Sequence, residues 1–253
     1  MFASTDELLC FMRTYVNISA KEGFMEKVIT AKDSSYKIKK MVILALISAM
    51  AYVITFVCRL PIMPSAPFLD LEFKSAVILI GAYIFGPLSG LVMSLVICLL
   101  EMVTFSSTGI IGCIMNILAT VSIVCPASLI YKKKKSTSGA IIGIAVGAIC
   151  MTIAMVLWNY LVTPLYMGIP REAIEAMLLP VFVPFNLIKA GLNGGAALFI
   201  FRPLSEALQK TNLIPKQIHN EKSRISSIIV AVLVSVFVIS SCILLIFALN
   251  GKL

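Results

Sequence analysis

Long apolar runs separated by short polar connections dominate the sequence from residue 41 onward. Residues 41–58 contain no charge, and residues 75–105 contain only Glu101. A helix that spans a bilayer needs roughly 20 apolar residues, so 75–105 is too long for one comfortable span. The sequence Gly86-Pro87-Leu88-Ser89-Gly90 predicts a tight turn that divides this run into two short helices.

Four further apolar runs follow, and polar connections separate them. They cover residues 108–131, 139–163, 177–201 and 225–249. Residues 164–176 predict a polar connection before the sixth helix, and a Lys- and Gln-rich piece precedes the seventh. We therefore expect an all-α integral membrane protein with this division of the chain: a cytoplasmic tail (1–36), a six-helix membrane domain (37–204), a cytoplasmic linker (205–224), and an additional transmembrane helix with a short outer tail (225–253).

Composition supports the membrane assignment and argues against several kinds of chemistry. The chain is 60% hydrophobic and only 13% charged, whereas soluble domains carry roughly 25% charged residues. No removable signal peptide is expected, because the first long apolar run begins only at residue 41. The seven cysteines form no CxxC motif, the single histidine, His219, lies in the linker, and the chain has no P-loop motif. We expect no enzyme activity, no metal and no cofactor, so uphill transport would need an external energy source.

The distribution of lysine and arginine predicts the orientation. With the N-terminus inside, twelve of these residues from position 37 onward lie in cytoplasmic segments and four lie outside. The positive-inside rule therefore favours a cytoplasmic N-terminus in the cell membrane. The proline-rich loop at 59–74 and the connection at 164–176 then both face outward, as does the start of the sixth helix. The net charge of +9 is explained by this bias, without a nucleic-acid partner.

One polar stripe lies inside the sixth apolar run. Asn186, Lys189 and Asn193 have the spacing i, i+3, i+7, which places them on one helical face. A lysine near the middle of a membrane helix costs about 2.5–3.5 kcal/mol on insertion scales, so it normally faces a ligand, a cavity or a partner. Two interpretations remain open: the stripe contacts a ligand, or Lys189 pairs with a buried acid such as Glu101.

Weaker candidates lie on other runs. Asn159 is an amide near the outer end of the fifth helix and needs partners for both its donors and its acceptor. Tyr160 and Tyr166, close by, could equally belong to an interfacial aromatic belt. Asn116 has a ligand role and a helix-packing role as open alternatives. Ala45 and Ala49 form an AxxxA spacing that suits close helix approach, within the chain or to another subunit.

Five segments, taken in order, resemble a known family. They read APFLDLEF, GAYIFGPLSG, STGIIGCIMNILA, NYLVTPLY and PFNLIKAGLNG, and together they cover roughly residues 41–204. The chain resembles the substrate-binding S components of energy-coupling factor (ECF) vitamin transporters, in particular the riboflavin-specific ones. This resemblance implies six helices, a cytoplasmic N-terminus, and a vitamin held near the extracellular side by the first outer loop and the outer parts of helices four to six.

The resemblance also implies roles for individual residues. Asn159 and Asn186 would bind the edge of the flavin ring, Lys189 would donate to a ring carbonyl or nitrogen, and Asn116 would support them. Phe68 and Leu69 of the outer loop would close over the ligand, with Tyr160 and Tyr166 nearby. Ala45 and Ala49 would dock on a membrane-embedded coupling subunit, and two ATPase subunits would supply energy.

The sequence departs from the family's usual pattern in three ways, one of which is that the 1–36 tail and the seventh helix lie outside the six-helix pattern. It reads Glu72-Phe73-Lys74-Ser75 where a Ser-Asp start to the second helix is usual, and it has Glu101 in a region that is often basic. Other hypotheses remain: an S component for another vitamin or a flavin analogue, or a membrane scaffold or enzyme with a structural Glu101–Lys189 pair.

Overall fold

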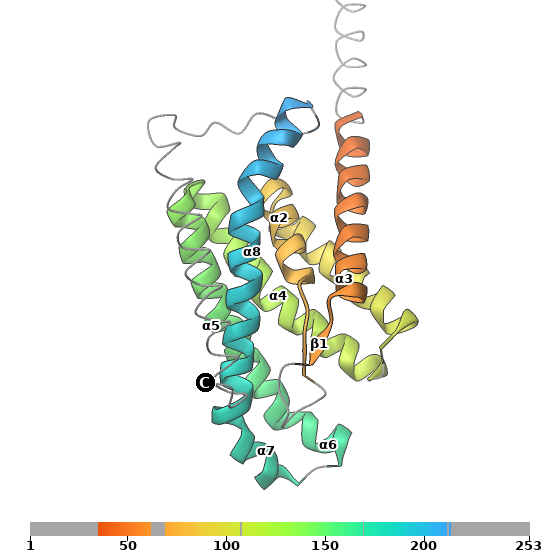
Figure 1. Ribbon diagram of the computed structural model, residues 1–253, viewed down its shortest axis with the longest axis vertical. Coiled ribbons are helices and arrows are strands. Elements are labelled where there is room, and N and C mark those ends of the chain that lie inside the picture. The colour runs from red at the N-terminus through yellow and green to blue at the C-terminus, as the bar shows by residue number, and fades with distance from the viewer. Residues whose placement is uncertain (1–34, 62–68, 107, 169, 212, 214–253) are drawn as a thin grey trace, which may run out of the picture. The chain divides into compact units, whose positions relative to one another are not determined.

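A computed structural model describes residues 35–61, 69–106, 108–168, 170–211 and 213 (Figure 1). The chain forms two compact units, which meet between Ile43 and Leu44, and the unit that begins at Leu44 is described by itself. The predicted seventh helix and nearly all of the predicted N-terminal tail lie outside the described residues.

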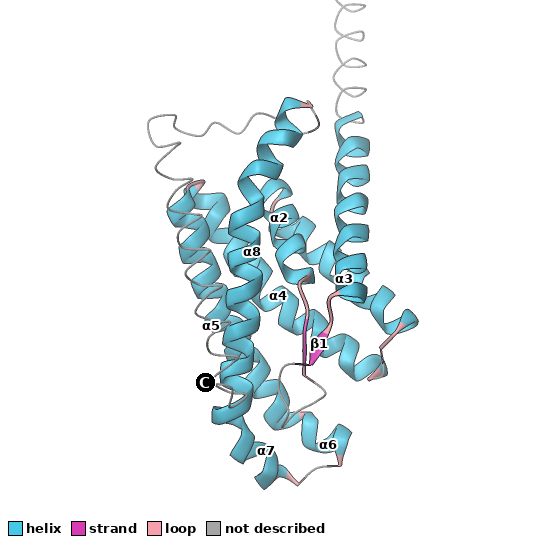
Figure 2. Cartoon of the chain, in the orientation of Figure 1, coloured by secondary structure: helices cyan, strands magenta, loops and turns pink. Residues whose placement is uncertain are grey.

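The described chain is almost entirely helical (Figure 2). After the helix Ser35–Val57, two short strands pair antiparallel, with Leu60 opposite Leu71 and Pro61 opposite Asp70. The elements that follow the first helix are β1 (Leu60–Pro61), β2 (Asp70–Leu71), α2 (Lys74–Phe85), α3 (Pro87–Thr104), α4 (Gly109–Lys134), α5 (Thr137–Leu161), α6 (Thr163–Met167), α7 (Arg171–Met177), the π-helix η1 (Leu178–Phe182) and α8 (Val183–Lys210).

Five helical stretches in the described part are long and apolar enough to cross a membrane. They are Ser35–Val57, α3, α4, α5 and the continuous stretch Arg171–Lys210, whereas α2 has only 12 residues. Helix is the expected form, because in lipid each backbone N–H and C=O must be satisfied within the segment. The predicted turn between the second and third helices is confirmed: Gly86 has a φ of 95° and Pro87 begins α3.

The predicted polar connection at 164–176 is not irregular. It contains α6 and α7, which lie at the lower end of the bundle in Figure 1. Pro164 stands in the first turn of α6 and Pro170 directly precedes α7. Proline suits these positions, because the first N–H groups of a helix have no intrahelical acceptor. Proline therefore begins these helices rather than preventing them.

Two prolines shape the last described helix. Pro184 has no N–H to offer the carbonyl of Pro180, and its ring crowds that carbonyl, which accounts for the wide π-helical turn η1 before α8. Pro203 lies inside α8, and the helix nevertheless continues to Lys210. The predicted helix end near Phe201 was therefore too early. A single missing hydrogen bond does not end the helix here.

The helices α4 and α5 pack most closely, through a stripe of glycines on α5. A Cβ atom on Gly143 would lie 2.6 Å from the Ala127 carbonyl oxygen, and one on Gly147 would lie 2.6 Å from that of Ile123. With Gly139, these glycines recur every four residues along one face of α5. Such spacing lets two backbones approach within a membrane, where packing rather than water exclusion drives helix association.

A buried apolar cluster joins the base of the outer loop to the last helices. It contains Leu69, Leu71, Ile174, Val181, Phe182, Phe185, Ile188 and Leu192. These residues come from the segment around β2, from α7, from η1 and from α8. The cluster therefore fixes the loop base against the half of α8 that carries the polar stripe.

The glycine stripe leads to a prediction about stability. Gly147→Val should push α5 away from α4 and destabilise the protein by roughly 1–3 kcal/mol, the usual cost of overpacking. The effect is measured as the shift in unfolding temperature of the purified protein, with size-exclusion chromatography used to monitor the loss of the folded form. Ala145→Val places the same side chain on the exposed face of α5 and should change little. Equal losses in both variants would contradict the close packing.

Candidate functional site

The polar stripe of α8 meets the base of the outer loop. The Lys189 Nζ atom lies 2.9 Å from Glu72 Oε1 and donates a hydrogen bond to the Asp70 backbone carbonyl at 3.3 Å. Both side chains are buried. Lys189 therefore has an acidic partner, which comes from the segment just before α2.

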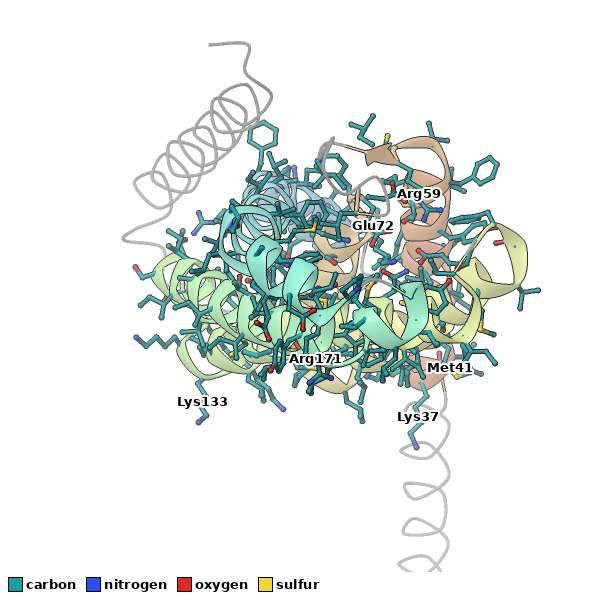
Figure 3. The ribbon with its side chains drawn as sticks, turned by 90° about the horizontal axis from the view of Figure 1, so that it is seen from below. Lys37, Met41, Arg59, Glu72, Lys133 and Arg171 are labelled. Carbon is teal, nitrogen blue, oxygen red and sulfur yellow. The ribbon has the colours of Figure 1, made fainter. Side chains whose placement is uncertain are left out.

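The Glu72 carboxylate is shared between two ammonium groups. Its Oε1 atom also lies 2.9 Å from Lys74 Nζ, and Lys74 in turn donates to Glu101 Oε2 at 2.6 Å. The four charges alternate in sign from α8 to α3, in the order Lys189, Glu72, Lys74, Glu101, and we call them the charge chain. Glu72 lies among the helices in Figure 3, whereas Lys133 points away from them. The formal charges of the four residues in the charge chain sum to zero.

The charge chain corrects one prediction. A buried acid does pair with Lys189, but the acid is Glu72 rather than Glu101, because Glu101 binds Lys74 instead. The other carboxylate oxygen of Glu101, Oε1, is buried and accepts no hydrogen bond from any described residue. A burial cost opposes ionisation of Glu72, but the adjacent Lys189 and Lys74 outweigh it and hold the pKa of Glu72 below its ordinary value.

Asn193 connects α8 to the start of α2. Its Nδ2 group donates to the Glu72 carbonyl at 2.8 Å and to the Lys189 carbonyl at 2.9 Å, and its Oδ1 accepts from the Ala76 N–H at 2.8 Å. The residue before α2, Phe73, provides no side-chain cap. Asn193 therefore caps the N-terminus of α2, although it lies 117 residues from Ala76 in the sequence. It also holds the backbone at Glu72, just before α2.

A separate pocket lies between the start of α4, the end of α5 and the short α6. Thr108, Ile111, Gly112, Met115, Trp158, Asn159, Val162, Thr163 and Tyr166 line it. Two predicted ligand-binding residues, Asn159 and Tyr166, thus share one cavity. The Asn159 amide donates to the Met155 carbonyl at 2.7 Å and accepts from the Thr163 hydroxyl at 2.9 Å. One N–H of Asn159 and one lone pair of its Oδ1 remain for another partner.

Asn186 is buried one turn before Lys189 on α8. Its Nδ2 group donates to the Phe182 carbonyl at 2.8 Å. No described residue donates to its Oδ1 atom, so the amide retains an acceptor and one N–H. Asn186 and Lys189 do not belong to the set of residues that line the pocket around Asn159.

The other predicted residues have varied surroundings. Tyr160 is half-buried, and its ring lies 5.2 Å from the Arg171 guanidinium carbon. Asn116 is half-buried on α4, beside the pocket residue Met115, and its side chain bonds to no described residue. Leu69 is buried in the apolar cluster, and Phe68 lies outside the described residues.

The predicted docking alanines lie on the helix Ser35–Val57. Ala45 and Ala49 are both exposed, whereas Ser48 between them is buried. Their spacing places the two small side chains on one side of the helix, one turn apart. Intrachain packing is therefore not their role in the described part of the chain.

Sequence reasoning missed Glu72, Lys74 and Trp158. The first two sit in a segment where charges at positions 70, 72 and 74 alternate with the apolar Leu71 and Phe73. Such alternation places the charged side chains on one side of an extended segment. Together with a membrane lysine that needs an acid, this spacing was a usable signal. Trp158 directly precedes Asn159 on α5 and lines the same pocket.

The charge chain leads to a prediction about coupling. Lys74→Met leaves Glu101 buried without its cation and should cost about 3–5 kcal/mol, whereas Lys74→Met/Glu101→Gln should cost far less. A double-mutant cycle, measured by denaturant titration, gives the coupling energy. The matched cycle with Lys189→Met and Glu101→Gln should give a clearly smaller coupling. The same coupling in both cycles would contradict the direct Lys74–Glu101 pair.

Comparison with known proteins identifies the family. Residues 39–201 match the family described as "ECF transporter, substrate-specific component". The riboflavin transporter RibU of Staphylococcus aureus is 33% identical over 178 residues, which cover 68% of this chain and 93% of that protein. The riboflavin transporter FmnP of Bacillus subtilis is 26% identical over 162 residues, covering 60% and 85%, and RibU of Streptococcus thermophilus is 29% identical over 181 residues, covering 68% and 85%.

A solved structure supports the same assignment. It is described as "Structure and mechanism of the S component of a bacterial ECF transporter", and it matches with a TM-score of 0.59 at 32% identity, covering 68% of this chain and 98% of that one. The predicted all-α membrane fold and the family resemblance are therefore confirmed. The chain belongs to the family of substrate-specific components of ECF transporters, and it is a multi-pass membrane protein that serves as a transporter subunit rather than an enzyme.

Proposed function

We propose that this chain is the riboflavin-binding specificity subunit of an ECF importer. The observation that carries the proposal is the combination of family membership with buried amides and a buried lysine on α5 and α8, at positions where the sequence resembles riboflavin-specific members. Three relatives are named riboflavin transporters.

The chemistry of a flavin suits these residues. Its ring system is flat and apolar over most of its area, and one edge carries an N–H between two carbonyl groups. Asn159 and Asn186 each retain both a donor and an acceptor, which is what that edge requires. Lys189 has three N–H groups, of which Glu72 and the Asp70 carbonyl occupy two. The third can donate to a ring carbonyl or nitrogen.

The pocket between α4, α5 and α6 suits the apolar part of the ring. Trp158, Met115 and Ile111 line it, and Tyr166 contributes a second aromatic ring. Asn159 belongs to this pocket, and its helix α5 also packs against α8, which carries Asn186 and Lys189. In this proposal the ligand binds along α5, so that it reaches Asn159 in the pocket and also Asn186 and Lys189 on α8. Asn116 supports the ring from α4, and Leu69, at the base of the outer loop, covers it from the loop side.

Capture takes place from the outside. We infer a cytoplasmic N-terminus from the twelve lysines and arginines from position 37 onward that this orientation places inside, including the exposed run Lys132–Lys135 at the end of α4. The base of the outer loop, α6 and α7 then face the exterior. A vitamin would reach Lys189 and Asn159 from that side.

Delivery depends on partners in this proposal. A membrane-embedded coupling subunit docks on the exposed Ala45 and Ala49, whose small side chains allow close helix approach. Two ATPase subunits supply the energy in trans, since the chain itself has no P-loop motif.

Riboflavin binding is directly measurable through Trp158, the only tryptophan of the chain. Riboflavin should quench Trp158 emission with one-to-one stoichiometry, because the ring enters the pocket that this side chain lines. Asn186→Ala and Asn159→Ala should each weaken binding by roughly 1–3 kcal/mol, the cost of an unpaired buried polar group.

Gln209→Ala is the matched control. This amide lies at the opposite end of α8 from Asn186, and it donates a hydrogen bond to the Ser205 hydroxyl. The variant should leave the affinity unchanged. A folded protein that binds no flavin would refute the proposal. Tight binding of another vitamin from a ligand panel, with no riboflavin binding, would assign the chain to a different S-component specificity.

The docking surface is testable by co-purification. Ala45→Trp/Ala49→Trp should abolish co-purification with the coupling subunit and the ATPases while riboflavin binding persists. Leu99→Trp adds the same bulk at an exposed position of α3 and should leave the complex intact. Retention of the complex by the double variant would place the docking surface elsewhere.

A further inference from the structure

The charge chain has no net charge, although it contains two lysines inside the membrane domain. Lys189 and Lys74 are balanced by Glu72 and Glu101, and all four side chains are at most 8% exposed. The neighbouring ion pair at the loop base, Arg59 with Asp70 at 2.6 Å, is also balanced. The surroundings of Lys189 are therefore electrically neutral as a whole.

A lone buried lysine would favour a different ligand from the one that this cluster favours. An isolated ammonium group in a water-poor site attracts carboxylates and phosphates, because opposite charges interact strongly where the effective dielectric constant is low. Glu72 removes that preference, since its carboxylate contacts Lys189 directly. An anion added beside the charge chain would give the site a net buried charge, which is costly.

We propose that Glu72 determines the charge specificity of the ligand site: by neutralising Lys189, it makes the site accept uncharged hydrogen-bond acceptors and disfavour anionic ligands. This inference rests on the proposed function, because it takes Lys189 as a ligand contact. Lys189 keeps its role as a donor, since one of its three N–H groups is left after the Glu72 and Asp70 contacts. Lys74 and Glu101 are positioning residues, which hold Glu72 from its other side.

Two flavins that differ by one charge test the proposal. The ligand 10-carboxymethylflavin is an anion, and 10-(2-hydroxyethyl)flavin is its neutral match with the same ring. Their dissociation constants are measured by Trp158 quenching in the purified full chain. The readout is the ratio of the two constants, because a variant that only loosens the site weakens both ligands alike.

The wild-type protein should prefer the neutral flavin. Glu72→Gln gives the charge chain a net charge of +1 and should shift the ratio about tenfold or more towards the anion. Glu72→Gln/Lys74→Met restores neutrality and should return the ratio towards the wild-type value. Glu175→Gln removes an exposed carboxylate of α7 that lies outside the charge chain, and it should leave the ratio unchanged.

Several outcomes would overturn the inference. One is an unchanged ratio in folded Glu72→Gln, and another is the same shift in Glu175→Gln. If Glu72→Gln does not fold, Glu101→Gln makes the same change in net charge, and an unchanged ratio there counts against the inference equally. Failure of the wild-type protein to bind riboflavin refutes the proposed function itself, which separates that failure from failure of the charge rule.

Discussion

The contact between Glu72 and Lys189 is the interaction on which the rest of the membrane domain depends. A charged side chain is expensive inside a bilayer, so each one requires a partner of opposite sign. Lys189 finds its partner in the segment before α2, and this requirement holds the outer loop base against α8. Asn193 and the apolar cluster around Phe185 strengthen the same junction. Helix packing and loop position are consequently fixed together.

Stability and recognition share residues at this junction. Replacing a buried ion pair by apolar side chains often leaves stability unchanged or improves it, so the charge chain is not explained by stability alone. A ligand with carbonyl and N–H groups needs polar partners that are already held in position. Ion-paired side chains, and asparagine amides held by hydrogen bonds to the backbone, supply such partners without leaving a net charge in the membrane. The structural and ligand-binding interpretations of Lys189 are therefore compatible.

The helices could be predicted because lipid leaves the backbone few alternatives. Apolar run lengths located α3, α4 and α5 within a few residues, and Gly86-Pro87 marked the turn. The helices α6 and α7 were missed because the segment 164–176 was interpreted as a polar connection, although its prolines fit the start of a helix. The stripe on α8 predicted that Lys189 needed a partner. The identity of that partner could not be predicted, because it depends on tertiary structure: Glu72 lies 117 residues from Lys189 in the sequence.

The cap that Asn193 places on α2 has a consequence for the order of assembly. At 12 residues, α2 is about 18 Å long, well short of a bilayer's roughly 30 Å hydrocarbon core. Its first turn depends on an amide from α8, which leaves the ribosome more than a hundred residues later. Until then the Ala76 N–H lacks its Asn193 acceptor and Glu72 lacks Lys189, although Lys74 already has both of its acidic partners, Glu72 and Glu101. Insertion of α2 is therefore completed late, when α8 joins the bundle, and translation of the last helix concludes the folding of one of the first.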